Sequence, residues 1–275
     1  MRLVKACRSI FRMQLILRLQ YRAAAWAKML TFIFWGLVHA AMMLIFFRFG
    51  RNAGAGISAG MSVDQAVAYG WLVQLVAPLL PIMAADNEVW EKIRNGEVGV
   101  ELCRPLDLYA HWFTRAAATR LAPFLLQLAP VAAVAMLLPA PYHLPPPASP
   151  EGFFACLLAI GAGLLLSCAC LGMTYALLLK VRWGEGPAWI MLITADVLSG
   201  SYLPLQLWPE WTQPFLSWQP FAGLLDLPLR FYVGTMAAEA VWRVVLFQLT
   251  WAVILAAAGW FWTGRSLKRL VIQGG

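Results

Sequence analysis

The chain has 275 residues, of which 61% are hydrophobic and only 12% are charged. A soluble domain carries about 25% charged residues and about 45–50% apolar ones, so this composition excludes an ordinary soluble fold and indicates lipid as the solvent. The net charge of +8 does not indicate a nucleic-acid partner, because the basic residues flank apolar runs and no soluble fold is left to enter a groove. We expect a single transmembrane domain over residues 1–275.

Residues 1–28 predict a basic amphipathic helix. The segment holds seven Lys and Arg residues, and at about 100° per residue one apolar face collects Leu3, Cys7, Ile10, Met13 and Leu17. Such a helix suits the inner membrane surface, where we expect it to form an elbow. A loose basic tail that only sets topology is the alternative.

Six apolar runs qualify, or nearly so, as spans of the hydrocarbon core, which needs about 20 residues. They are Met29–Phe47, Ala66–Ala85, Ala118–Ala140, Phe154–Leu179, Pro187–Leu205 and Val241–Thr263. The N-terminal segment and the segments after the second, fourth and sixth runs hold seven, five, two and three of the 21 Lys and Arg residues. Basic segments face the cytoplasm. We therefore expect an all-α membrane protein with six transmembrane helices and both termini in the cytoplasm.

The segment 86–107 concentrates charge between the second and third runs. It holds nine charged residues, including six of the 13 acids in the chain. Asp86 is placed to cap a short helix, with Glu88 in its first turn, and Asn95-Gly96 is a typical helix stop. Acids beside an anionic inner leaflet are repelled by it, so we expect this segment to dock on a basic protein surface. A solvated loop is the alternative.

Asp196 lies near the middle of the fifth run, where a carboxylate is costly and marks a functional hypothesis. Thr194, Ser199 and Ser201 are close enough in sequence to hydrogen-bond it or a ligand. We predict a translocation pathway at Asp196, Thr194 and Ser199; the alternatives are a structural bond to another helix and a shorter span that places Asp196 near the surface. His39, Gln74 and Gln127 are more typical of helix–helix hydrogen bonds.

The segment 206–239 is too apolar for a water-exposed loop and is interrupted by proline. It carries the aromatic residues Trp208, Trp211 and Trp218. A re-entrant segment that enters the outer leaflet and returns meets both constraints, provided its backbone is buried in protein. An aromatic belt at the interface is the alternative.

Motifs for catalysis are missing. Without a G-x-x-x-x-G-K-[ST] loop the chain cannot hold ATP in the usual way. The five cysteines and three histidines are not spaced as a metal-ligand set. We expect no catalytic residue, no metal and no cofactor bound by this chain.

The basic N-terminal segment, the six runs and the stretch IRNGEVGVELCRPLDLYAHWF resemble the permease subunits of type-2 ABC exporters. A pattern I-x-x-G-x-x-x-x-x-L-x-x-P-L, common in the uncharacterised bacterial branch of that family, is met by Ile93, Gly96, Leu102, Pro105 and Leu106. The resemblance implies a bacterial inner-membrane protein that moves a lipid, glycan or drug-like substrate. It also implies separate cytoplasmic ATPase subunits that carry ATP and Mg, and a second permease, identical or related.

On this resemblance the helix at residues 86–95 becomes the coupling helix that the ATPase grips. The candidate coupling residues are Asp86, Glu88, Trp90, Glu91, Ile93, Arg94, Gly96 and Pro105. Two other classes stay open: a proton-coupled secondary transporter that uses Asp196 as a relay, and an integral-membrane enzyme that modifies lipid.

Overall fold

The computed structural model describes residues 2–20, 22–52, 61–80, 86–102, 107–181 and 184–268. Within these ranges the protein is helical and contains no β-strand, as the sequence predicts. The α-helices are α1 (Arg2–Gln20), α2 (Arg22–Asn52), α3 (Val63–Val76), α4 (Asn87–Arg94), α5 (Val98–Leu102), α6 (Leu108–Leu137), α7 (Pro150–Lys180), α8 (Gly186–Leu198), α9 (Gln213–Trp218), α10 (Asp226–Val233) and α11 (Val241–Leu267). Short 3-10 helices are η1 (Ala77–Leu79), η2 (Leu205–Leu207), η3 (Glu210–Thr212), η4 (Pro220–Gly223) and η5 (Ala238–Ala240).

Four helical stretches of the described chain are long and apolar enough to cross a membrane: Trp26–Phe49, Leu108–Leu137, Pro150–Lys180 and Ala238–Leu267. The predicted second and fifth spans correspond to α3 with η1 and to α8, which are shorter. α3 gives way to a 3-10 turn at Pro78, which has no N–H to continue the helix. α8 stops before Gly200, whose φ of +87° suits a helix C-terminus.

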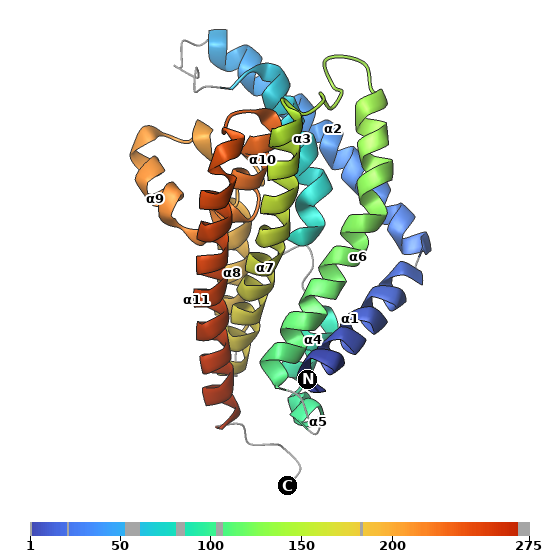
Figure 1. The fold of residues 1–275 in the computed structure, drawn as a ribbon, viewed down its shortest axis with the longest axis vertical. Helices are drawn as coiled ribbons and strands as arrows, with labels where there is room; N and C mark the ends of the chain where they lie inside the picture. The colour runs from blue at the N-terminus through green and yellow to red at the C-terminus, as the bar shows by residue number, and fades with distance from the viewer. Residues whose placement is uncertain are drawn as a thin grey trace.

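The helices form a bundle with two distinct ends (Figure 1). One end carries the start of α1, the helices α4 and α5, and the last turns of α7 and α11. The other end carries the last turn of α2, the helix α10 and the first turns of α7 and α11. α7 runs through the middle and packs against α11, α10, α8 and α6. α3 is the most enclosed helix, because every residue from Ala66 to Val76 is buried.

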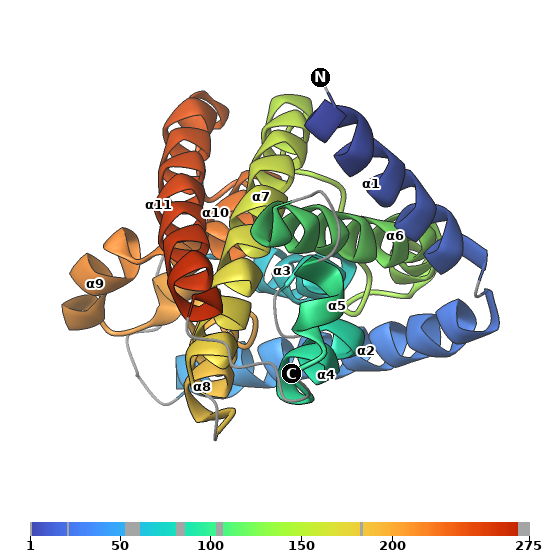
Figure 2. The same ribbon diagram turned by 90° about the horizontal axis from the view of Figure 1, so that it is seen from below.

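α1 and α2 form the outer side of the bundle next to α6 (Figure 2). The face of α1 that is turned inward carries Gln14, which is 6% exposed. Met13 and Leu17, from the predicted apolar face, are about half exposed at 58% and 45%. α1 is a helix as predicted; its position at a membrane surface stays a prediction.

α6 begins ten residues before the predicted third span. Asp107 caps it by accepting the backbone N–H of Ala110 at 2.9 Å. Arg115 and Arg120, two of the five basic residues counted after the second predicted run, are both buried on α6. They are tolerated there because each finds polar partners; Arg120 Nε, for example, donates to the Ser167 hydroxyl at 3.0 Å.

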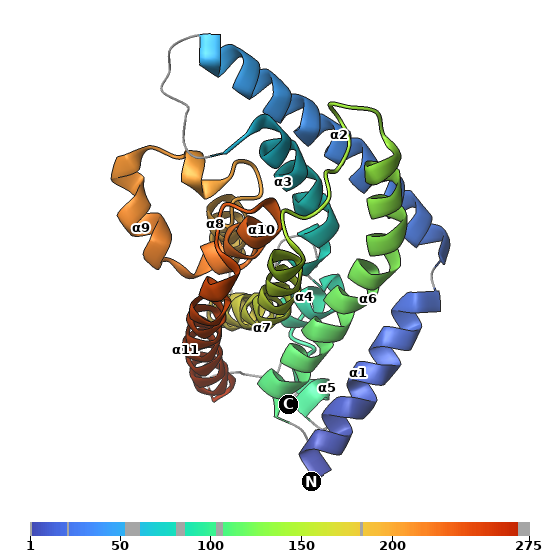
Figure 3. The ribbon, with the colours of Figure 1, turned by 45° about the horizontal axis from the view of Figure 1, so that its top comes forward.

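α9 projects from the bundle on the side away from α6 (Figure 3). Residues 199–240 return from α8 to α11 through short helices rather than through an extended loop. Asp226 anchors this return. Its Oδ1 accepts the backbone N–H of Leu205 at 2.9 Å and the hydroxyl of Tyr69 at 3.3 Å, and its Oδ2 pairs with Arg230 at 2.6 Å.

Gly36 lets α2 approach α3. A Cβ at this position would lie 2.2 Å from the ring of Trp71. We expect Gly36→Val to destabilise the protein by about 1–3 kcal/mol through overpacking. The midpoint of thermal unfolding in detergent, followed by size-exclusion chromatography, should fall by at least about 2 °C.

The matched control is Gly161→Val, because Gly161 lies on α7 with open space around its Cβ position. Its midpoint should stay at the wild-type value. Equal midpoints for the two variants would contradict the close packing of α2 on α3.

Candidate functional site

α4 is held on the bundle by its apolar side. Val89, Trp90 and Ile93 are buried in a cluster that includes side chains of α6, α7 and α8. The rings of Trp90 and Trp189, on α8, lie 5.5 Å apart. Trp90 and Ile93, both predicted to couple to an ATPase, therefore contact this chain's own helices.

The outward side of α4 is polar. Glu91, Arg94 and Gly96 are exposed, and so is Glu97 in the turn that follows. Gly96 has a φ of +75°, which ends the helix as the Asn95-Gly96 pair predicts. Arg94 Nε lies 3.2 Å from Glu185 at the start of α8. Pro105 falls outside the described residues.

Arg115 joins α4 to α6. Its Nε lies 2.5 Å from Oδ2 of Asp86, and its Nη2 pairs with Glu88. Asp86 caps α4 by accepting the N–H of Glu88 at 3.2 Å, and its own N–H donates to the Tyr175 hydroxyl on α7, also at 3.2 Å. Arg115 and Asp86 are 6% and 5% exposed. Breaking such a buried pair by removing one partner costs about 3–5 kcal/mol.

Lys92 continues the polar cluster toward α5. Its Nζ lies 2.6 Å from Glu88 and 3.2 Å from Glu101. Glu101 also accepts the indole N–H of Trp112 at 2.8 Å. Hydrogen bonds from Arg115, and then from Lys92, lower the pKa of Glu88 from 4.5 to about 2. Sequence reasoning missed Arg115; the available signal was a cation within a mostly apolar stretch, close in sequence to acids that need a partner.

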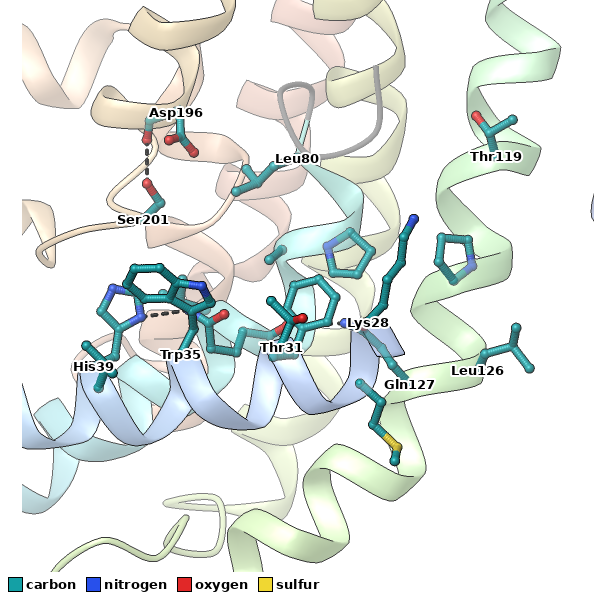
Figure 4. Close-up of a pocket in the computed structure, with 18 of the residues that line it drawn as sticks. Lys28, Thr31, Trp35, His39, Leu80, Thr119, Leu126, Gln127, Asp196 and Ser201 are labelled. Atoms are coloured by element: carbon teal, nitrogen blue, oxygen red, sulfur yellow. Dashed lines mark hydrogen bonds between the residues drawn. The ribbon is translucent and has the colours of Figure 1, made fainter. Parts of the chain in front are cut away.

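A cavity of about 1490 Å³ lies between α2, α3 and α6 and is also lined by residues of α1 and of the turn after α8. The Asp86, Glu88 and Arg115 cluster forms part of its wall. Asp196 and Ser201 lie across the space from Thr119, Leu126 and Gln127 of α6, and Trp35 and His39 of α2 line a further wall (Figure 4).

Asp196 of the predicted pathway lines this cavity. Its Oδ2 accepts the hydroxyl of Tyr202 at 2.8 Å, while its main-chain carbonyl accepts the hydroxyls of Ser199 and Ser201 at 2.7 and 2.8 Å. Ser201 and Tyr202 line the cavity as well, whereas Thr194 and Ser199 are not among its lining residues. The structure thus brings the sequence-predicted Asp196 together with two neighbours that the prediction did not include in the pathway.

The other intramembrane polar groups mostly bond to one another, as the sequence predicts. Gln74 Nε2 lies 2.7 Å from His39 Nδ1 and so joins α3 to α2. Gln127 Nε2 donates to the Gln74 carbonyl at 3.2 Å and so joins α6 to α3. These contacts bind the helices around the cavity to one another.

The aromatic residues of the segment 206–239 differ in position. Trp208 packs on a small cluster formed by Leu205, Leu216 and Ala222. Trp211 and Trp218 are 83% and 71% exposed, and the ring of Trp218 lies 5.3 Å from that of Trp251 on α11. Trp208 is therefore part of the interior of the segment, while Trp211 and Trp218 are available to lipid.

Among the described residues, no group of three or more His, Cys, Asp or Glu side chains is arranged to hold a metal ion.

A family model described as ABC-2 family transporter protein matches residues 37–274. No curated protein and no solved structure matches the chain.

We expect Arg115→Gln to release α4 from the bundle, because the guanidinium that pairs with both Asp86 and Glu88 is then lost. Hydrogen exchange of the amides at residues 87–94 should accelerate by at least about tenfold. The matched control is Arg94→Gln, since Arg94 and Glu185 are 59% and 32% exposed in their side chains and such pairs contribute little. If both variants exchange like the wild type, Arg115 does not hold α4.

The Glu88 contact also predicts a pH dependence. A carboxyl whose folded pKa lies below its unfolded value stabilises the protein above the unfolded pKa and loses that effect as pH falls toward the folded one. The difference in thermal stability between wild type and Glu88→Gln should be constant from about pH 7 to pH 5 and shrink as pH falls from 4.5 toward about 2. A difference that does not change over this range would contradict the lowered pKa.

Proposed function

This chain belongs to the ABC-2 transporter family, and on that premise we propose that it is the permease of an ATP-driven exporter in a bacterial inner membrane. It is a multi-pass membrane component of a transporter; in the proposal it does not hydrolyse ATP itself. In the proposal, ATPase subunits made as separate chains carry ATP and Mg and bind from the cytoplasm. A second permease, identical or related, completes the transporter.

The observation that supports the proposal most strongly is the way α4 packs against the rest of the bundle. Its apolar side is fixed to α6, α7 and α8, and its outward side presents Glu91 and Glu97. Among the described residues neither acid has an ion-pair partner. A basic groove on an ATPase supplies the missing countercharge.

A displacement of α4 can be transmitted to the bundle through direct side-chain contacts. The Arg115 pairs carry displacement to α6, and the Trp90 and Tyr175 contacts carry it to α8 and α7. A ligand shifts such an equilibrium only by its differential affinity for the two states. In the proposal, ATP binding favours the ATPase arrangement that moves α4, and the bundle follows as a rigid-body switch.

The proposed topology keeps six crossings, with α3 and η1 and α8 as parts of the second and fifth. Both termini and α4 face the cytoplasm, and α1 lies as an elbow on the inner surface. The common location of α1, α4 and the end of α11 at one end of the bundle supports this arrangement. The segment 206–239 then faces the outer leaflet, where Trp211 and Trp218 contact lipid.

The cavity is the proposed pathway for an amphipathic substrate. Its walls are mainly apolar, with a few polar groups among them, as is typical of sites for small organic ligands. Lipid, glycan conjugates and drug-like molecules all belong to this class.

Reversing the outward charges should detach the ATPase. We expect Glu91→Lys with Glu97→Lys to lower the recovery of a nucleotide-binding subunit with the tagged chain by at least about tenfold, and to abolish ATP-dependent substrate movement in inverted vesicles. The matched control reverses Glu210 and Glu239, which are exposed at the opposite end. It should leave recovery unchanged.

The same preparations test the two rival classes. Substrate movement under a pH gradient without any ATPase would replace this proposal by a secondary transporter. Chemically altered lipid without ATP, abolished by Asp196→Asn, would replace it by an enzyme.

A further inference from the structure

We infer that the cavity takes an amphipathic organic cation, with Asp196 as the counterion. This inference rests on the proposed function, because it names the substrate class of the same pathway. It follows from how the charges along the cavity wall are neutralised.

The buried charges of the cavity do not balance. Arg115 is neutralised by Asp86 and by Glu88, and Glu88 also pairs with Lys92. Asp196 is 4% exposed, and no Lys, Arg or His of the described chain forms an ion pair with it. Its carboxylate accepts a hydrogen bond from the neutral hydroxyl of Tyr202. A buried carboxylate gains more from a countercharge than an exposed one, because the local dielectric is low.

Lys28 is the other unneutralised charge on the lining, and it is exposed. Water and lipid headgroups therefore screen Lys28, and it selects an anion weakly. Asp196 is enclosed, and so it dominates selection by charge.

The rest of the lining fits the apolar part of such a cation. Trp26, Phe32, Trp35 and Phe46 line the cavity together with Met and Leu side chains. Aromatic faces attract cations, more so where water is excluded. The site is thus a large aromatic pocket in which Asp196 is the lining acid that has no ion-pair partner among the described residues.

The test uses tetraphenylphosphonium and tetraphenylborate, a cation and an anion of nearly the same size and shape. Binding of each ion to the purified full-length chain in lipid nanodiscs is measured with empty discs subtracted. We expect Asp196→Asn to weaken binding of the cation by about tenfold or more and to leave the anion unchanged. Asp196→Glu keeps the charge and should restore cation binding to within about threefold of the wild type. Glu151→Gln is the matched control, because Glu151 is an exposed acid at the start of α7 that does not line the cavity, and it should leave the cation unaffected.

Unchanged cation binding by a folded Asp196→Asn variant overturns the inference, and so does an equal loss for both ions. Should Asp196→Asn fail to fold, Ser201→Cys gives a second measurement, because Ser201 lines the cavity beside Asp196. The cation should slow labelling of this cysteine by a thiol reagent at least about threefold and the anion should not; equal protection by both ions, or by neither, overturns the inference. Binding requires no ATPase, so intact cation binding without ATPase recovery refutes the proposed function alone.

Discussion

Arg115 holds two acids of the charged segment against a helix that is otherwise apolar, and much of the structure depends on this contact. Without the guanidinium, Asp86 and Glu88 would lose the cation on α6 that binds both of them, and removing one partner of a buried ion pair is strongly destabilising. Because the pair exists, α4 can lie flat against α6 and α7 rather than extend into solvent. The ion pairs with Arg115 orient α4 on the bundle. Val89, Trp90 and Ile93 then strengthen this attachment by burying apolar surface. The outcome is a short helix that moves only if the bundle beneath it moves.

A second constraint explains why a cavity exists. α3 gives way to a 3-10 turn at Pro78, and α8 ends at Leu198, so two helices that could fill the bundle stop short. Broken helices in a membrane leave carbonyls that must find donors. Hydroxyl groups supply them here: Ser167 donates to the Leu79 carbonyl, and Ser199 and Ser201 donate to the Asp196 carbonyl. A carbonyl group at the end of each of these two helices thus accepts a hydrogen bond from within the chain. The space beside each helix end stays open.

Composition and periodicity were sufficient to predict an all-helical membrane protein, the cap at Asp86 and the stop at Gly96, since these depend on local physics. The same reasoning began the third span at Ala118 and did not anticipate that Arg115 and Arg120 are buried on α6. Their burial depends on Asp86, Glu88 and Ser167, which are remote in sequence, and no single-helix pattern contains that information. The sequence shows that α4 has an apolar face, but it does not show what that face contacts. A hydrophobic stripe looks the same whether it packs against its own chain or against a partner protein. Asp196 was found because a lone acid in an apolar run is conspicuous. Asp226 was overlooked because it lies in a segment interrupted by prolines and aromatic residues, where an acid does not stand out.

The two acid sites on the cavity wall differ in a way that bears on transport. The charge of Asp86 is neutralised by Arg115, a fixed part of the fold, whereas Asp196 meets only a tyrosine hydroxyl. A ligand that neutralises Asp196 and also contacts α2 and α6 would hold these two helices and the turn after α8 together. Displacing α4 acts on α6 through Arg115 and therefore changes the distance across the same space. In the proposed function, substrate binding and movement of α4 are therefore linked through α6, and by reciprocity each alters the equilibrium of the other.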